Sequence, residues 1–258
     1  MTKSAQSVKL YATPPQPCSY LPDMLASNTF IDPAFIPSPE AYQSLIERGF
    51  RRSGTHLYKP VCNSCNACLP CRVNPTTFKP DRSQRRCWKK NSDLQVHLNP
   101  ASFSDEAFSL YAKYLDSRHA EGDMANPDHE SFTHFLYADW SNTWFVEFRL
   151  NQALKCVAVV DRLPNAVSAV YTFFDPDEAR RSLGTLAVLW QLNFARIQGL
   201  SWVYLGYWIE ASRKMQYKSR YRPLQVLENG RWHELDIGTT DALTESHHGN
   251  SSHEINSP

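Results

Sequence analysis

The order of predicted elements in the second half of the chain constrains the fold most strongly. Three runs rich in β-branched and aromatic residues, WFVEFRL (144–150), LKCVAVVD (154–161) and AVSAVYTFF (166–174), are separated by spacers of three and four residues. Such spacing predicts an antiparallel meander of strands. An apolar helix is predicted over 184–198 and a further strand over 200–208. The pattern therefore predicts an α+β fold around one sheet.

Helices are predicted before this sheet. The segment IPSPEAYQSLIERGF (36–50) has Ser38 as a possible N-cap, Pro39 in the first turn and Gly49 as a possible end. Two more amphipathic segments lie at 104–122 and 127–140. The final residues, 238–258, are polar and poor in apolar residues, so we predict a disordered tail there.

The segment CNSCNACLPC (62–71) sets four of the seven cysteines in three consecutive CxxC steps. No apolar run approaches the roughly 20 residues that cross a bilayer, and no secretory signal is recognisable, so we expect a cytoplasmic protein. A reducing compartment favours metal ligation or redox chemistry over disulfides, with reduced, unliganded thiols as the alternative. A metal would stabilise the surrounding proline-rich module, whose core is small.

The net charge of +1 hides a strongly basic strip between Arg48 and Lys90. Asp81 is the only acid in it, and aromatic residues, among them Trp88, are interleaved with the cations. This composition suits contact with a phosphate backbone and stacked bases, although a solvated basic face is the plainer alternative. The cations of the strip are Arg48, Arg51, Arg52, Lys59, Arg72, Lys79, Arg82, Arg85, Arg86, Lys89 and Lys90.

The strand and helix order of 144–208 is similar to that of N-acetyltransferases. Those enzymes bind the coenzyme A pyrophosphate at a glycine-containing turn that opens the helix, where backbone N–H groups are free. The matching segment here is RSLGTL, with Arg181 and Gly184 in place but Leu186 where a small residue is needed. This departure argues for an acyl donor other than coenzyme A.

A longer set of motifs resembles one family along nearly the whole chain. The pieces, in order, are CSYL (18–21), GFRRSG (49–54), YKPVCNSCNACLPCRV (58–73), FKPDRSQRR (78–86), RHAEGDM (118–124), VDRLPNAVSAVYTFFDPD (160–177), SLGTLAVLWQ (182–191) and YLGYWIEASRKMQYKSRYRP (204–223). On these motifs the chain is identified as a member of the bacterial branch of the aminoacyl-tRNA-protein transferases, the aspartate/glutamate leucyltransferases, which are related to eukaryotic arginyl-tRNA-protein transferases.

The resemblance implies a small cysteine-bearing amino-terminal domain (1–95) and an N-acetyltransferase-like acyltransferase domain of the GNAT/Fem type (96–237), before the tail at 238–258. It implies transfer of leucine from leucyl-tRNA to proteins with amino-terminal Asp or Glu, which marks them for degradation through the N-degron pathway. Arginyl-tRNA as donor, or a metal-stabilised RNA-binding module without catalysis, are the alternatives.

The resemblance also implies a ligand set. The family pattern joins Cys18 to Cys62, Cys65 and Cys68, whereas an apolar residue is usual where this chain has Cys71. The set Cys62, Cys65, Cys68 and Cys71 is the alternative, but its two-residue spacers crowd four sulfurs around one ion. Four thiolates suit Zn²⁺ or an iron–sulfur cluster, in a structural or regulatory role, because the chemistry itself needs no cofactor.

Site residues follow from the predicted acyltransferase layout. Asp161, at the end of the second strand, could orient the incoming amine and accept its proton, or it could cap a turn. Tyr171 and Tyr207 are candidate proton donors beside the acyl site. Arg118, His119 and Lys214 are candidates for the substrate. The residues predicted to contact tRNA are Arg51, Arg52, Lys59, Arg72, Arg82, Arg85, Arg86 and Lys218.

Overall fold

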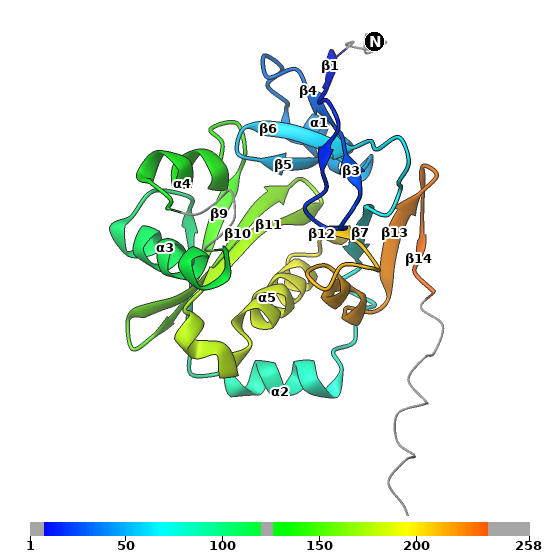
Figure 1. Ribbon diagram of the computed structural model, residues 1–258. Coiled ribbons are helices and arrows are strands. Elements are labelled where there is room, and N and C mark those ends of the chain that lie inside the picture. The colour runs from blue at the N-terminus through cyan, green and yellow to red at the C-terminus, as the bar shows by residue number, and fades with distance from the viewer. Residues whose placement is uncertain (1–7, 120–125, 237–258) are drawn as a thin grey trace, which may run out of the picture.

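The computed structural model describes residues 8–119 and 126–236, so the tail predicted at 238–258 lies outside the described residues. The α+β prediction is confirmed (Figure 1). One eight-stranded sheet forms the centre of the molecule. From one edge to the other its strands are β8 (Gln95–Pro100), β9 (Thr143–Leu150), β10 (Ala153–Leu163), β11 (Ala166–Phe174), β12 (Trp202–Trp208), β7 (Leu69–Val73), β13 (Leu224–Glu228) and β14 (Arg231–Glu234).

Helices cover both faces of this sheet. On one face, α5 (Leu183–Ile197) packs over the central strands and α2 (Arg82–Lys90) packs against α5 (Figure 1). On the other face lie α3 (Asp105–His119) and α4 (His129–Leu136). The alternation of β-strand side chains accounts for two cores, because successive residues of β10 are buried against opposite helical layers. The strands predicted for the meander and the four predicted helices are confirmed.

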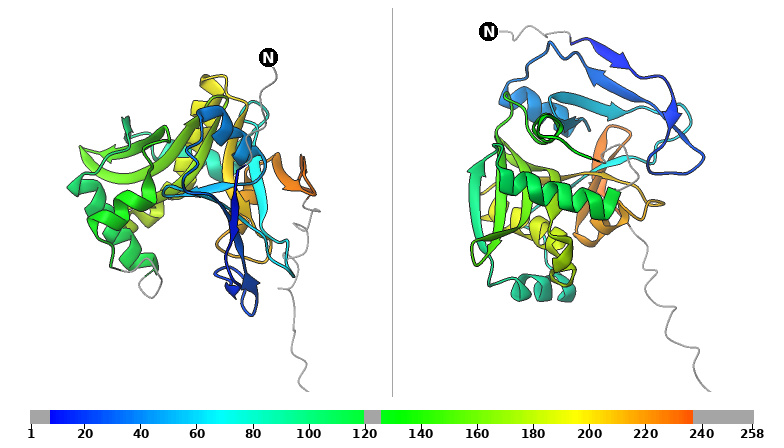
Figure 2. Two further views of the ribbon diagram at one scale, coloured as in Figure 1. Left: turned by 90° about the horizontal axis from the view of Figure 1, so that it is seen from above. Right: turned by 60° about the vertical axis from the view of Figure 1, so that its left-hand side comes forward.

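A smaller sheet stands beside the large one. Its strands are β1 (Leu10–Ala12), β4 (Asn28–Ile31), β6 (His56–Pro60) and β5 (Arg51–Ser53), in that order, and a two-stranded ribbon pairs β2 (Gln16–Pro17) with β3 (Leu25–Ala26). Figure 2 shows this unit packed at one side of the large sheet.

Helix α1 (Pro39–Glu47) joins the two sheets. The Ser38 Oγ caps it by accepting the Ala41 N–H at 3.2 Å, as predicted. Its buried Tyr42 and Ile46 belong to a core cluster that includes Tyr204 of β12. Apolar contact therefore fixes the small sheet against the strands that follow the meander.

Strand β7 lies before the predicted domain boundary at residue 95 but belongs to the large sheet. It lies between β12 and β13 in the large sheet, with Cys71 and Val73 fully buried. Helix α2, also before residue 95, contributes Cys87 to the core under α5. The large sheet is therefore built from both predicted parts of the chain.

Strands β11 and β12 separate after a short parallel pairing. Their register runs from Ala166 opposite Trp202 to Ser168 opposite Tyr204, and no pair follows. A register shift in β11 opposite Val159 and another in β12 before Gly206 bend the two strands away from each other. No ladder pairing therefore joins residues 169–174 of β11 to residues 205–208 of β12, and we call these two stretches, which are not paired with each other, the strand gap.

Candidate functional site

Tyr171 stands on the β11 side of the strand gap. Its ring lies among the rings of Tyr111, Tyr114 and Phe135, with centroids 5.1–6.4 Å away. The hydroxyl is buried and has no hydrogen-bond partner among the described residues. Burial raises the pKa of Tyr171, so the hydroxyl keeps its proton at neutral pH. Its predicted role as a proton donor stays a prediction.

Two buried cations stand on the β12 side. Arg51 of β5 is 5% exposed and Lys218 of η2 (Gln216–Arg220) is 6% exposed. Both approach Gly206, where an added methyl carbon would lie 3.6 Å from Lys218 Nζ and 4.0 Å from Arg51 Nε. Arg51 donates to the Gly206 carbonyl at 3.1 Å, and Lys218 donates to the Tyr207 carbonyl.

No carboxylate neutralises this pair among the described residues, and the buried Arg51 Nε has no acceptor. Burial, together with the charge of Arg51, lowers the pKa of Lys218 to about 8. Both side chains are buried, unlike the exposed cations of the strip. Their predicted contact with tRNA stays a prediction.

Asp161 lies in a closed ion pair. Its carboxylate accepts from Arg52 Nε at 2.7 Å and Nη2 at 2.8 Å, and from the Tyr42 and Thr143 hydroxyls at 2.6 Å each. The side chains of Asp161 and Arg52 are 0% exposed. Burial would raise the pKa of Asp161, but the Arg52 charge and the donated hydrogen bonds lower it. The two side chains satisfy each other away from solvent, which gives them a structural role; the predicted catalytic role of Asp161 and the predicted tRNA contact of Arg52 stay predictions.

Tyr207 is also held by contacts within the protein. It is 5% exposed, and its hydroxyl donates to the Gly49 carbonyl at 2.8 Å. The Arg51 guanidinium lies 5.6 Å from its ring centroid. The hydroxyl proton is therefore already engaged, and the ring lies beside the buried Arg51. The predicted role of Tyr207 as a proton donor stays a prediction.

The predicted substrate residues lie farther out. Arg118 is exposed on α3, with its guanidinium 5.8 Å from the Phe174 ring at the end of β11. Lys214 is exposed in the loop after β12. His119 ends α3, and its side chain lies outside the described part. Arg118 is therefore near the strand gap, and the three roles stay predictions.

The remaining predicted tRNA contacts divide into two groups. The Arg72 guanidinium lies between Trp202 and Trp232, 3.6 and 4.2 Å from their centroids, and Lys59 Nζ donates to the Arg48 carbonyl at 3.2 Å. Burial lowers the pKa of Arg72. These two side chains are only partly exposed. The fully exposed ones are on α2, namely Arg82, Arg85 and Arg86.

Four thiols face one pocket of about 330 Å³ beneath the small sheet, those of Cys18, Cys62, Cys65 and Cys68. Burial, followed by the proximity of the other three thiols, raises the pKa of Cys68 to about 12. Soft thiolates converging on one pocket fit Zn²⁺ or an iron–sulfur cluster. Within residues 8–119 and 126–236, however, no three potential ligands are already arranged around one point that could hold an ion.

Cys71, the alternative ligand, does not line this pocket. Its side chain is fully buried in the core under α5. Cys87 and Cys156 are buried as well and do not line the pocket. The ligand set with Cys18 is therefore the one whose members lie together.

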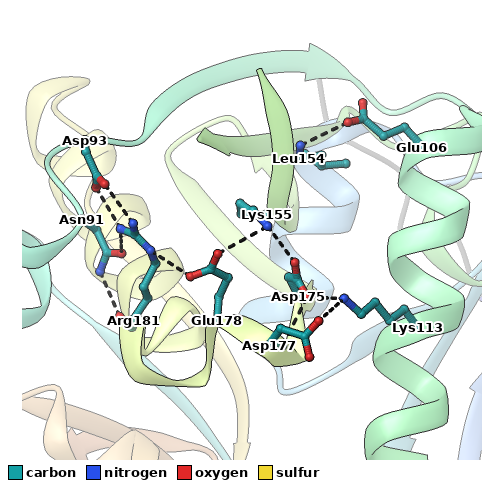
Figure 3. Close-up of polar contacts among 10 residues, drawn as sticks. All are labelled: Asn91, Asp93, Glu106, Lys113, Leu154, Lys155, Asp175, Asp177, Glu178 and Arg181. Atoms are coloured by element: carbon teal, nitrogen blue, oxygen red, sulfur yellow. Dashed lines mark hydrogen bonds and ion pairs between the residues drawn. The ribbon is translucent and has the colours of Figure 1, made fainter. Parts of the chain in front are cut away.

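The turn that opens α5 is held by ion pairs (Figure 3). Arg181 donates to both oxygens of Asp93 at 2.9 Å and to Glu178 at 3.0 Å. Leu186 is 5% exposed in the core. The arginine that would meet a pyrophosphate is thus already paired, which agrees with the argument against coenzyme A.

Asp175, at the end of β11, continues this network. It is 7% exposed and accepts from Lys113 at 2.7 Å and from Lys155 at 2.9 Å (Figure 3). Against the effect of burial, these two ammonium groups lower the pKa of Asp175 to about 2. The network connects α3, β10 and the turn before α5, and so fixes the β11 side of the strand gap.

The comparisons with known proteins agree on one family. The family model "Arginine-tRNA-protein transferase, N terminus" matches residues 16–86, and the model of the C terminus matches residues 106–228. The aspartate/glutamate leucyltransferase of Pseudomonas fluorescens is 52% identical over 232 residues, which are 90% of this chain and 98% of that protein. The chain belongs to this family. A relative of the same description from Hahella chejuensis is 50% identical over 88% of the chain and 97% of its own length.

Solved structures give a weaker likeness. L-PGS from Bacillus licheniformis is 10% identical, with a TM-score of 0.43 over 65% of this chain and 49% of that one. FemX is 8% identical, with a TM-score of 0.41 over 78% of this chain and 79% of that one. Within the residues that the structure describes, no helix is both long enough and apolar enough to cross a membrane.

Proposed function

We propose that this protein transfers leucine from leucyl-tRNA to the α-amine of proteins that begin with Asp or Glu. Relatives of that description, about half identical over nearly their whole length, support both donor and acceptor. In this proposal the strand gap is the acyl-transfer site of an N-acetyltransferase-like fold, and the thiol-bearing part, 1–95, assists it. Marking the acceptor for degradation is the expected consequence.

The chemistry needs positioning more than strong acids or bases. The acceptor nitrogen attacks the ester carbonyl carbon, a C–N bond forms, the C–O bond to the tRNA ribose breaks, and the amine proton ends on the ribose oxygen. An α-amine has a pKa of roughly 8, so its neutral form is accessible at neutral pH. The protonated Tyr171 hydroxyl, which lacks a partner within the described residues, suits donation to the developing oxyanion or the leaving oxygen.

The observation that carries the acceptor assignment is the buried pair Arg51 and Lys218. A site that accepts acidic side chains and rejects neutral ones needs a buried cation, because a neutral side chain leaves that charge uncompensated. These cations meet that need, since no described carboxylate pairs with either of them. Arg118, near the end of β11, would then contact the acceptor farther from the gap.

The thiols of Cys18, Cys62, Cys65 and Cys68 would hold Zn²⁺ or an iron–sulfur cluster. Bound there, the group would stabilise the small sheet and the segment that leads into β7, with no part in the transfer step. Burial, followed by the proximity of the other three thiols, raises the pKa of Cys68, and a bound cation would stabilise the thiolates against both effects, which supports the assignment.

The test is transfer of labelled leucine, in parallel with labelled arginine, from charged tRNA to matched peptides that begin with Asp, Asn, Glu or Gln. We expect leucine to be transferred to the acidic peptides alone. Lys218→Met should lower kcat/KM for the Asp peptide by at least about 30-fold, because a partner of a buried charge pair is lost. The control Lys9→Met removes an exposed ammonium just before β1 instead.

Equal transfer to the Asp and Asn peptides would refute the acceptor assignment. Transfer of arginine alone would keep the reaction and replace the donor. Binding of tRNA without transfer of either amino acid would favour the RNA-binding module without catalysis.

A further inference from the structure

A second hollow, which shares no lining residue with the thiol pocket, lies between α2 and α5. This α2/α5 groove has a volume of about 460 Å³, within the range of small-ligand sites. Figure 1 shows the two helices side by side on the face of the sheet opposite α3. The residues that matter in the groove are Phe78, Arg85, Trp88, Leu189, Leu192 and Arg196.

The groove has an apolar floor and an aromatic wall. Leu189 and Leu192 of α5 are 4% and 2% exposed and form the floor, whereas Trp88 of α2 is 40% exposed. A tryptophan held with its ring partly open to solvent is a stacking surface for another flat ring. The side-chain amide of Gln84 lines the groove but already donates to the Arg220 carbonyl and accepts from the Asp81 N–H. It is therefore not free to hydrogen-bond a ligand.

The helix beside the groove carries a dense positive charge. The exposed cations of α2, together with one of α5, form no ion pair with any described residue. Hydrogen bonds from Arg85 and Lys90 go to the Pro80 and Arg180 carbonyls, which are neutral. Of the acids nearby in sequence, Asp81 accepts the Gln84 N–H as the N-cap of α2 and Asp93 is paired with Arg181. The exposed cations are Arg82, Arg85, Arg86, Lys89 and Lys90 of α2 and Arg196 of α5.

An apolar groove bordered by cations without ion-pair partners suits a nucleotide whose base is not base-paired, together with its flanking phosphates. We propose that the α2/α5 groove holds an unpaired nucleotide of the tRNA, with its base against Trp88 and its phosphates on the α2 cations. The inference rests on the proposed function for the identity of the RNA.

An anionic membrane surface is the other partner that basic helices meet. A helix that lies on a membrane presents a raised apolar face to the lipid, whereas here the apolar surface is recessed below the cations. The recess favours the nucleotide, and lipid binding becomes an outcome of the test.

The experiment measures the dissociation constant of the full chain for uncharged tRNA as salt is varied. Trp88→Ala should weaken binding by about 5- to 150-fold, the range for loss of one stacked base, and Trp88→Tyr should retain most of it. Arg85→Ala should reduce the slope of log K against log salt by about 0.7 to 0.9, the loss of one phosphate contact. The control Arg231→Ala removes an exposed cation from β14, outside the groove.

Transfer assays separate this inference from the proposed function. In Trp88→Ala, KM for leucyl-tRNA should rise while kcat at saturating tRNA and KM for the acidic peptide stay unchanged. The groove assignment would be overturned if Trp88→Ala and Arg85→Ala bound tRNA with the affinity and salt slope of the wild type, even if leucine transfer were intact. It would also be overturned if these variants lost binding to phosphatidylserine vesicles but not to tRNA. If the wild type transfers no leucine but Trp88→Ala still loses tRNA binding, the groove stands and the proposed function fails.

Discussion

Replacing Asp161 by Asn should unfold the protein more readily rather than remove a catalytic base. The buried Arg52 would keep its charge but lose its only described counterion, while Tyr42 and Thr143 would lose a charged acceptor. Breaking a buried pair by removing one partner costs about 3–5 kcal/mol. Typical domains unfold with about 5–15 kcal/mol, so the change is a large part of the total.

Smaller changes in the same network should give a graded series. Tyr42→Phe removes one hydrogen bond to the carboxylate and should cost about 1.5–3 kcal/mol. Removing both charges together, as in Arg52→Met with Asp161→Leu, should cost much less than the sum of the single changes, because no charge is left buried alone.

Urea unfolding at pH 7 measures these free energies, and leucine transfer by the folded fraction reports activity. Arg231→Ala, at an exposed position of β14, is the matched control and should change stability by less than about 0.5 kcal/mol. An Asp161→Asn protein with wild-type stability and no transfer would refute this argument and restore Asp161 as a catalytic residue.

Two further predictions concern the charges and the thiols. Asp175 has a pKa of about 2 instead of 3.8, so it should contribute about 2 kcal/mol of stability that is present above about pH 4 and lost as the pH falls towards 2. In urea unfolding at pH 7, the free energy of unfolding of Asp175→Asn should therefore be lower than that of the wild type by about that amount, and near pH 2 the two should differ little. Equal stability at pH 7 would contradict the stabilising role of the Asp175 carboxylate. Cys65→Ser should lower the zinc or iron bound to anaerobically purified protein, measured by elemental analysis, whereas the buried Cys156→Ala should not. Unchanged metal content in Cys65→Ser would remove the thiol pocket as the metal site.

Hydrophobic periodicity was sufficient to predict the meander, because strands β9 to β11 are consecutive and paired through short turns. The same approach missed β7. Its sequence, LPCRV, continues the CxxC run and contains a proline, and its partners β12 and β13 are more than 100 residues away in the chain. Only the completed sheet shows that Cys71 faces the core and not the other thiols.

The functional residues were harder to predict for a similar reason. A charge run in a sequence does not tell which cations are exposed, and the basic strip divides between buried Arg51 and Arg52 and exposed Arg85 and Arg86. The partner of Arg52 lies 109 residues away. Trp88 was noticed only as one aromatic residue among the cations, since the groove also needs α5.

The two consecutive arginines of β5 explain how a cation can be kept buried beside the strand gap. Neighbouring residues on a strand point to opposite faces, so Arg51 and Arg52 cannot share one environment. Arg52 is neutralised by Asp161 and hydrogen-bonded to the Gly54 and Leu136 carbonyls, which anchors β5 to β10 and α4. That anchor holds Arg51 over Tyr204 and Tyr207, with no described carboxylate beside it. One arginine thus stabilises the fold, and in the proposed function the other presents the charge that the acidic acceptor would neutralise.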